Sequence, residues 1–353
     1  DMNFEPKDYD LVHIFQLDWT PETYFYAKKV NEAGVPLVLS PIHHDVKEVK
    51  KFDDEFVFDF RRISKFFFRD QFKRDTFKNV YRSLFDKRKF KPTMYSVFHG
   101  FKNMQREVLK MSDAVLVQTV REAEDLKRTF DVDFKWEKVL NGVGEAFINP
   151  KPFKNPFEFE DYIMCVGRIE PRKNQLNVIK AVEKFREETG LDVKLVLIGK
   201  VSPSKHFEYN LLINKLLRKH KWIIRLDNSI NYSDLPSYYH FAKVCVSASW
   251  FETTGLTSLE ALYCGANTVA SGPRAKEYLG SFASFCVPDD VNSIKEAIKK
   301  EYFEPRPVLD EKIRKEYTWQ NAAEKTLSVY EDVLSSKTSK VDNKKPKSSK
   351  KKK

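Results

Sequence analysis

Short apolar runs alternate with longer amphipathic stretches along most of the chain. In the first half, apolar runs predict buried strands at 11–15, 37–40 and 114–119, and helical spacing predicts helices at 21–33, 102–111 and 121–130. The second half alternates more regularly, with strands predicted at 162–166, 193–198, 223–226, 244–248, 268–271 and 284–287. Helices are predicted between them at 175–188, 207–219, 235–241, 256–263, 275–278 and 293–301. This alternation predicts an α/β fold of two doubly wound, Rossmann-like domains with parallel sheets.

A polar, proline-rich stretch separates the two halves. Pro150, Pro152 and Pro156 lie within it, and a chain of 353 residues is long enough for two cores. We therefore expect an N-terminal domain at 1–150, a C-terminal ligand-binding domain at 151–335 and a disordered lysine-rich tail at 336–353. Ligands of such folds bind in the crevice at the carboxyl ends of the strands.

The positive charge is concentrated in the tail. From Lys337 to Lys353 there are nine lysines against one acidic residue, which accounts for +8 of the net charge of +11. A tail so poor in apolar residues is expected to remain solvated. No apolar run approaches the roughly 20 residues of a membrane span, which argues against an integral membrane protein.

A second basic stretch, at 61–91, has twelve Lys or Arg and three Asp with aromatic residues interleaved. Helical spacing within it predicts a helix from Gln71 to Asp86. An ordinary amphipathic helix that packs its aromatic face on a core is the favoured interpretation. Binding to an anionic membrane surface and binding to single-stranded nucleic acid are the alternatives, although no specific nucleic-acid partner is expected.

The cysteines give no sign of a metal or redox motif. Cys165, Cys245, Cys264 and Cys286 have no close spacing, and the first two fall inside predicted strands. Reduced, buried thiols in a cytoplasmic protein are therefore expected.

Three glycines in a glycine-poor chain mark places where backbone could approach a ligand. Gly167 and Gly199 each follow a predicted strand, and Gly255 begins a predicted helix. Gly167 opens a loop that also carries Arg168, Arg172 and Lys173 before the next helix starts. Fixed cations at a strand end suit a diphosphate leaving group, whose negative charge grows as its bond breaks.

A second loop carries a pair of glutamates. Glu252 is expected in the loop after the strand at 244–248, and Glu260 about one turn into the following helix. A carboxylate in that position can bind paired sugar hydroxyls. The backbone amides of Gly255, Leu256 and Thr257 begin the helix, where free N–H groups can bind a phosphate.

Taken together, these motifs resemble the retaining nucleotide-sugar glycosyltransferases of family four (group 1), which have the two-domain GT-B fold. The resemblance covers about residues 9–334. It rests on Gly167–Lys173, Glu252–Glu260, the following segment 261–271, Asn141–Val143, and 112–119 with Glu122.

The resemblance implies a role for each matching position. Arg168 and Lys173 would bind the donor diphosphate, Glu260 the ribose hydroxyls, and Glu252 the transferred sugar. The expected reaction moves a hexose from a nucleotide-diphosphate sugar to a hydroxyl of a lipid-linked or polysaccharide acceptor. It proceeds with retention of anomeric configuration and without a metal or other cofactor. Such an enzyme would be cytoplasmic, with peripheral attachment to the inner membrane face as an option.

The family also places a histidine of the first domain near the donor sugar. His44 is slightly preferred here to its neighbour His43, and His99 is a further candidate. The sequence departs from the family in two respects. An opening strand with a glycine-rich loop is not found before the segment at 9–15, and Thr254 stands where the family often has an aromatic residue. The first departure leaves a second interpretation open, a truncated or catalytically decayed protein that binds a sugar nucleotide or a membrane surface.

Overall fold

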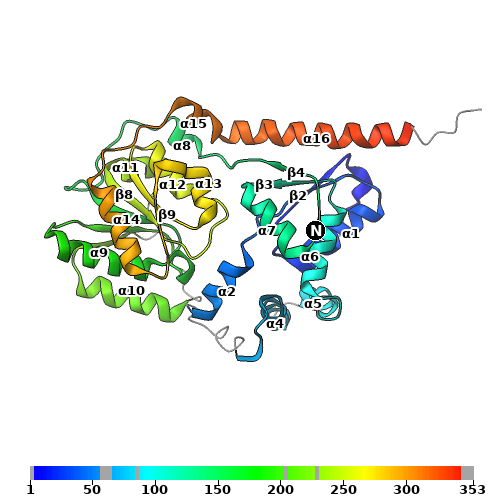
Figure 1. The fold of residues 1–353 in the computed structure, drawn as a ribbon, viewed down its shortest axis with the longest axis horizontal. Coiled ribbons are helices and arrows are strands. Elements are labelled where there is room, and N and C mark those ends of the chain that lie inside the picture. Colours follow the sequence, from blue (N-terminus) through cyan, green and yellow to red (C-terminus); the bar gives the residue numbers. More distant parts are fainter. Residues whose placement is uncertain (1–3, 56–65, 85–86, 202–205, 227–229, 343–353) are drawn as a thin grey trace, which may run out of the picture. The chain divides into compact units, whose positions relative to one another are not determined.

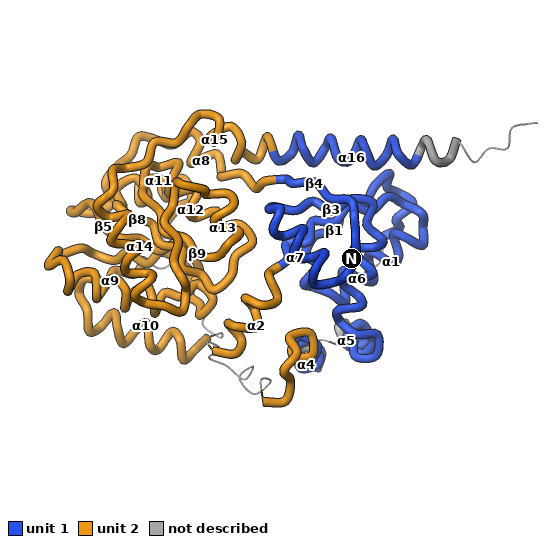
Figure 2. The backbone as a smooth tube through the Cα atoms, viewed as in Figure 1, with its two compact units in different colours: residues 1–43, 75–139, 322–353 blue, residues 44–74, 140–321 orange. Residues whose placement is uncertain are grey.

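The structure, a computed structural model, describes residues 4–55, 66–84, 87–201, 206–226 and 230–342 (Figure 1). The chain forms two compact units from interleaved parts of the sequence (Figure 2). Unit 1 consists of residues 1–43, 75–139 and 322–353, and unit 2 of residues 44–74 and 140–321. The single boundary near residue 150 that we expected is thus replaced by several crossings, the central one at 139–140.

Unit 1 is built on a four-stranded parallel sheet of order β1-β2-β3-β4. Its strands are β1 (Val12–Phe15), β2 (Leu37–Ser40), β3 (Ala114–Val117) and β4 (Trp136–Lys138). The order follows the chain, so within the described residues the sheet is wound in one direction only. The three predicted strands are present, and β4, which is short and largely exposed, was not predicted.

Helices of unit 1 pack on this sheet and on one another. They are α1 (Thr20–Glu32), α5 (Lys87–His99), α6 (Phe101–Met111) and α7 (Val120–Phe130), together with most of α4 (Gln71–Ser83). Thr119 caps α7 by accepting a hydrogen bond from the backbone N–H of Glu122 at 3.1 Å. The buried Glu122 carboxylate accepts the N–H groups of Gln118 and His43, each at 2.8 Å, and so fixes the loop after β2.

Unit 2 contains a six-stranded parallel sheet of order β10-β9-β8-β5-β6-β7. The strands are β5 (Tyr162–Val166), β6 (Leu195–Ile198), β7 (Ile223–Leu226), β8 (Ala242–Ser247), β9 (Asn267–Ser271) and β10 (Ser284–Cys286). All six were predicted, because each is an apolar run bounded by polar residues. The direction of winding reverses between β5 and β8, which makes their carboxyl ends the position where such a sheet binds ligands.

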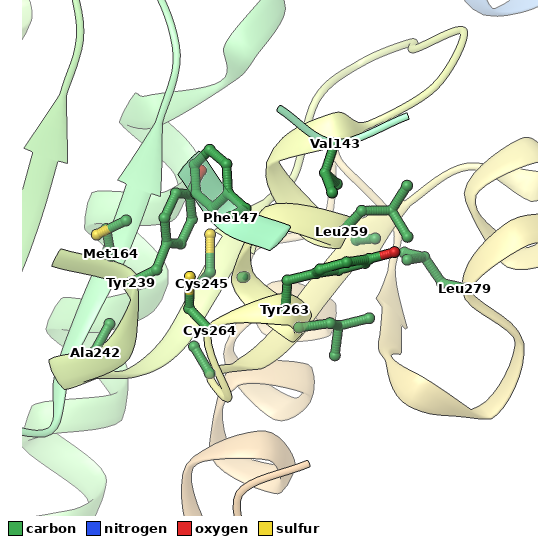
Figure 3. Close-up of a cluster of buried hydrophobic side chains, with 14 of the residues drawn as sticks. Val143, Phe147, Met164, Tyr239, Ala242, Cys245, Leu259, Tyr263, Cys264 and Leu279 are labelled. Atoms are coloured by element: carbon green, nitrogen blue, oxygen red, sulfur yellow. The ribbon is translucent and has the colours of Figure 1, made fainter. Parts of the chain in front are cut away.

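The helices of unit 2 follow its strands. They are α8 (Glu145–Ile148), α9 (Gln175–Thr189), α10 (Phe207–Lys219), α11 (Leu235–Phe241), α12 (Leu256–Tyr263), α13 (Pro273–Leu279), α14 (Val291–Phe303) and α15 (Glu311–Glu316). The apolar face of α12 is buried against Phe147, Tyr239 and neighbouring side chains (Figure 3). This core fixes the helix that carries Glu260.

A segment from the N-terminal part of the sequence also belongs to unit 2. It includes α2 (Val46–Glu55), which was not predicted, and it packs Phe52 against Trp250 and Phe251. Lys51 Nζ lies 2.5 Å from Asp289 Oδ2. These contacts explain why residues 44–74 do not belong to the unit that precedes them in sequence.

The last helix, α16 (Trp319–Asp342), begins in unit 2 and continues into unit 1. In unit 1 its Val329 and Val333 are buried with Val38 and Leu116, and Tyr330 Oη lies 2.6 Å from His13 Nδ1. The tail that we expected to be disordered from residue 336 is therefore helical as far as Asp342, because this packing extends the helix. Residues 343–353 lie outside the described part of the chain.

Two further expectations concern the cysteines and the membrane. Cys165, Cys245, Cys264 and Cys286 are all buried free thiols, as predicted. Within the described ranges, no helix combines the length and the apolar character needed to cross a bilayer.

Candidate active site at the carboxyl ends of β5 and β8

Both loops singled out in the sequence lie at the point where unit 2 reverses its winding. The loop after β5 carries Gly167 to Lys173, and the loop after β8 carries Glu252. Since β5 and β8 are parallel neighbours, their carboxyl ends lie at the same edge of the sheet. The backbone joins the loops directly, because the N–H of Trp250 donates to the carbonyl of Arg172 at 2.9 Å.

A cluster of charged side chains spans the two loops. Lys173 Nζ donates a hydrogen bond to Glu252 Oε1, and Arg172 Nη1 donates to Glu252 Oε2 at 3.2 Å. Arg172 Nε also lies 3.2 Å from Glu170 Oε1. Arg168, which we expected to share the work with Lys173, has a side chain 69% exposed and pairs with Glu170 instead. The cations that hold Glu252 are thus Lys173 and Arg172.

This arrangement keeps Glu252 charged. Burial raises the pKa of its carboxyl, but the positive charges of Lys173 and Arg172 lower it by more, so the pKa lies below the ordinary glutamate value. The site therefore presents an ionised carboxylate with two cations in fixed contact.

The glycines after β5 and β6 allow the backbone to come close. A Cβ on Gly199 would lie 2.0 Å from the carbonyl oxygen of Gly167, and Gly199 has a φ of +155°. A Cβ on Gly167 would lie 3.3 Å from Cε of Lys173. Gly199 therefore has a packing role that the sequence did not reveal, and Gly167 lies directly under the Lys173 side chain.

Glu260 lies in α12, close to the charged cluster in sequence but in a different environment. Its side chain is buried, and Tyr239 Oη donates a hydrogen bond to Glu260 Oε2 at 2.8 Å. Burial raises the pKa of Glu260, although the hydroxyls of Tyr239 and Tyr232 work in the opposite direction. The two glutamates of the motif thus have opposite pKa shifts, which equips them for different roles.

The start of α12 offers fewer free amides than expected. The N–H of Gly255 donates to Tyr278 Oη at 2.6 Å, and the N–H of Leu256 donates to the carbonyl of Thr254 at 3.0 Å. The side-chain hydroxyls of Thr257 and Ser258, in contrast, are buried with no hydrogen-bond partner among the described residues. A ligand at this helix start would find hydroxyl groups to bind as well as backbone.

The three candidate histidines lie in different places. His44 belongs to unit 2, where its ring packs edge-on against Phe251 with centroids 5.0 Å apart. His43 is buried in unit 1 with Nδ1 2.6 Å from Asp18 Oδ1. His99, also in unit 1, has Nε2 2.8 Å from Glu107 Oε1. Of the three, His44 is the one that contacts the residue next to Glu252.

Comparison with known proteins places this site in a family. Residues 148–318 match the family described as glycosyl transferases, group 1. The chain carries a group 1 glycosyl transferase domain. That domain includes β5, β8 and α12, and hence both loops of the charged cluster.

Curated proteins match about half of the chain at moderate identity. O-antigen chain mannosyltransferase B of Escherichia coli is 27% identical over 188 residues, which cover 50% of this chain and 47% of that protein. Glycogen synthase of Mycobacterium tuberculosis is 24% identical over 204 residues, covering 54% of this chain and 47% of that protein. The chain therefore matches about half the length of these relatives.

Solved structures match the chain over more of its length. Sucrose-phosphate synthase from Thermosynechococcus elongatus has a TM-score of 0.64 at 16% identity, covering 93% of this chain and 75% of that one. Trehalose 6-phosphate synthase from Burkholderia multivorans also has a TM-score of 0.64, at 14% identity, covering 97% of this chain and 73% of that one. With its two parallel α/β sheets, the chain has the GT-B fold, as predicted.

Sequence reasoning assigned no role in the candidate site to Asn174 or to the side chain of Asn141. Asn174 is buried and donates to the carbonyl of Ala248 at 3.0 Å and to that of Pro288 at 2.7 Å, which ties together the loops after β5, β8 and β10. Asn141 donates to Thr254 Oγ1 at 3.0 Å. The only signal for Asn174 was its position at the start of a helix after the cationic loop.

Proposed function

We propose that the chain is a retaining glycosyltransferase that moves a hexose from a nucleotide-diphosphate sugar to a hydroxyl of a lipid-linked or polysaccharide acceptor, without a metal ion. The observation that carries the proposal is the cluster of Lys173, Arg172 and Glu252 at the reversal point of the sheet, together with Glu260, which is buried in the following helix α12.

The two cations suit the charge that develops on the leaving diphosphate. Lys173 and Arg172 are held in place by Glu252, so they need no reorganisation when negative charge grows on the phosphate oxygen. Two fixed cations can supply the charge stabilisation that a divalent ion provides elsewhere, which supports a metal-independent reaction. Arg168 is exposed and could join them once a donor is bound.

Glu260 is suited to the ribose of the donor. Its ionised carboxylate can accept hydrogen bonds from both ribose hydroxyls, while Tyr239 fixes its orientation. The partnerless hydroxyls of Thr257 and Ser258 give the start of α12 donors for a phosphate or a sugar oxygen.

Glu252 and His44 then remain for the transferred sugar. In the proposed reaction the acceptor oxygen forms a bond to C1 of the hexose on the face that the diphosphate leaves. The C1–O bond to the phosphate breaks, and the acceptor proton passes to the departing phosphate oxygen. The charged face around Glu252 would stabilise the positive charge that builds on the sugar ring.

The names of the relatives bear on the class of donor sugar and of acceptor. The names of the curated relatives, mannosyltransferase and glycogen synthase, favour a hexose donor and a saccharide acceptor. The cytoplasmic location expected from the cysteines stays a prediction.

The proposal is tested by incubating the purified chain with UDP-glucose, UDP-N-acetylglucosamine and GDP-mannose, and measuring donor hydrolysis and thermal stabilisation. One donor should stabilise the fold and be hydrolysed slowly, with EDTA leaving the rate unchanged. Lys173→Ala should lower the rate by about a hundredfold or more, because it removes a fixed charge from the leaving group. The anomeric configuration of the released sugar, followed by NMR, reports retention.

Lys180→Ala is the matched control, because Lys180 is an exposed lysine on the helix that follows the same loop. It should keep the wild-type rate. Equal rates of donor hydrolysis in the Lys173 and Lys180 variants would contradict the assignment of Lys173 to the active site. Stabilisation by a donor that is never turned over would contradict transfer and favour a protein that only binds sugar nucleotides.

A further inference from the structure

Helix α5 of unit 1 carries its apolar residues on the outside. Phe90, Met94, Val97 and Phe98 are spaced as neighbours on one side of a helix, and all four are exposed. Phe98 is 84% exposed and Phe90 49%. In an ordinary surface helix, such apolar residues face the core. In α5 they face away from it, so the apolar side of this helix is the exposed side.

The side of α5 that faces the interior is small and partly polar. Pro92, Thr93 and Ser96 are buried, and Ser96 Oγ donates to the carbonyl of Thr93 at 2.6 Å, so the helix satisfies its own buried hydroxyl. Tyr95 stacks on His99 with ring centroids 5.1 Å apart. The helix thus packs on α1 and α6 while its most apolar residues stay on the exposed side.

The charge of α5 indicates what could cover that face. The helix contains Lys87, Arg88, Lys89 and Lys91 and no acidic residue, and Lys91 is exposed next to Phe90. An apolar stripe accompanied by cations alone is typical of helices that lie in the interface of an anionic membrane. A contact of this face with a second copy would bring together two helices that both contain basic and no acidic residues, which is unfavourable.

We propose that α5 docks on an anionic lipid surface, with Phe90, Met94, Val97 and Phe98 entering the boundary between headgroups and acyl chains. This proposal is narrower than the membrane interpretation of the basic stretch at 61–91, because it assigns lipid binding to the exposed side of one helix. The proposal goes beyond the proposed function and does not depend on it, since a chain that transfers no sugar could still bind vesicles.

The test is co-sedimentation of the full chain with vesicles, either of phosphatidylcholine alone or of equal parts phosphatidylcholine and phosphatidylglycerol. The chain should bind the anionic vesicles and not the neutral ones. Phe98→Ser should weaken binding by about tenfold, because it removes most of one buried aromatic side chain from the interface. The double variant with Phe90→Ser should bind more weakly still.

Phe207→Ser, in α10 of unit 2, is the control for losing an exposed phenylalanine at a helix, and it should bind like the wild type. Thermal melting checks that the variants fold, as expected for exposed positions. Binding that is unchanged by the α5 variants, or equal on neutral vesicles, would overturn the proposal. Self-association of the wild type in the absence of lipid, abolished by Phe98→Ser, would overturn it in favour of a second copy.

Discussion

Glu252 keeps its charge because two cations contact it in a place where burial favours the neutral form. Neutralising either cation would leave that carboxylate with less compensation, so Lys173 and Arg172 support the fold of the loops as well as the proposed chemistry. The cationic loop and the acidic loop therefore depend on each other.

The opposite pKa shifts of the two glutamates lead to a prediction about pH. Because burial raises the pKa of Glu260, its carboxylate takes up a proton at a higher pH than an ordinary glutamate, whereas Glu252 stays ionised to lower pH. Donor affinity should therefore weaken as the pH falls through the raised pKa of Glu260. Isothermal titration of the donor over a range of pH measures this decline.

Glu260→Gln should bind the donor more weakly at neutral pH and lose the decline, because the amide does not titrate. Glu187→Gln, at an exposed position of α9, should keep both the affinity and the pH dependence of the wild type. A decline that survives in Glu260→Gln would assign it to another group.

At the scale of residues, the places of the candidate side chains in the fold were predictable where chemistry and spacing coincide. Lys173, Glu252 and Glu260 lie in the loops and the helix where they were expected. It was not predictable that Arg172 rather than Arg168 contacts Glu252, because both arginines follow the same strand and the turn at Pro171–Lys173 decides which one points at Glu252. The hydrogen bond from the Gly255 N–H to Tyr278 Oη was not predictable either, because Tyr278 lies further along the chain, in α13.

Among the elements, α2 shows how a short segment can support a site made by other parts of the chain. Its Phe52 packs against Trp250 and Phe251, with the Phe52 and Phe251 rings 5.6 Å apart, and Phe251 precedes Glu252. The α2 helix therefore supports the loop that carries the carboxylate.

Phe52→Ala should cost roughly 2–4 kcal/mol of unfolding free energy, as expected for a large cavity in a buried cluster. It should also lower donor turnover, because the loop at Glu252 loses its support. Phe52→Leu fills most of the space and should cost about 1.5 kcal/mol or less. Urea denaturation and donor hydrolysis measure the two effects, and an alanine variant as stable and active as the leucine variant would contradict the role of α2.

The strands of both sheets other than β4 were predictable from sequence, because buried parallel strands contain apolar runs, whereas β4 is short and largely exposed. Helices were less predictable where their surroundings decide the outcome. The segment that forms α5 contains Pro92, which argues against a helix interior, and α16 runs into a lysine-rich segment that suggests disorder. In α16 the packing of Val329 and Val333 on the sheet overrides that composition.

At the scale of the whole molecule, most of the net charge can be removed without removing any residue of the charged cluster. Removing residues 343–353 takes away seven lysines and no acidic residue, so the net charge falls from +11 to +4. Donor hydrolysis should not change, because the charged cluster lies in unit 2 and none of its residues is removed. A large loss of hydrolysis would show that the tail takes part in the reaction.

Cutting the chain after Ser328 is the informative comparison. It also removes Val329, Tyr330 and Val333, and it should lower the unfolding free energy of unit 1 by several kcal/mol, since each buried valine contributes roughly 1.5–3 kcal/mol. Thermal unfolding of the two shortened proteins measures the difference. Equal stability would show that the end of α16 contributes little to unit 1.

The path of α16 also sets the order in which the protein can be completed during synthesis. The sheet of unit 1 is translated before most of unit 2, but Val329 and Val333, which cover part of that sheet, are translated after every residue of unit 2. Unit 2 is made later and yet has its whole sequence available first, because it ends at residue 321. The nascent N-terminal sheet must therefore keep part of its apolar surface uncovered until α16 has been made, after the whole of unit 2.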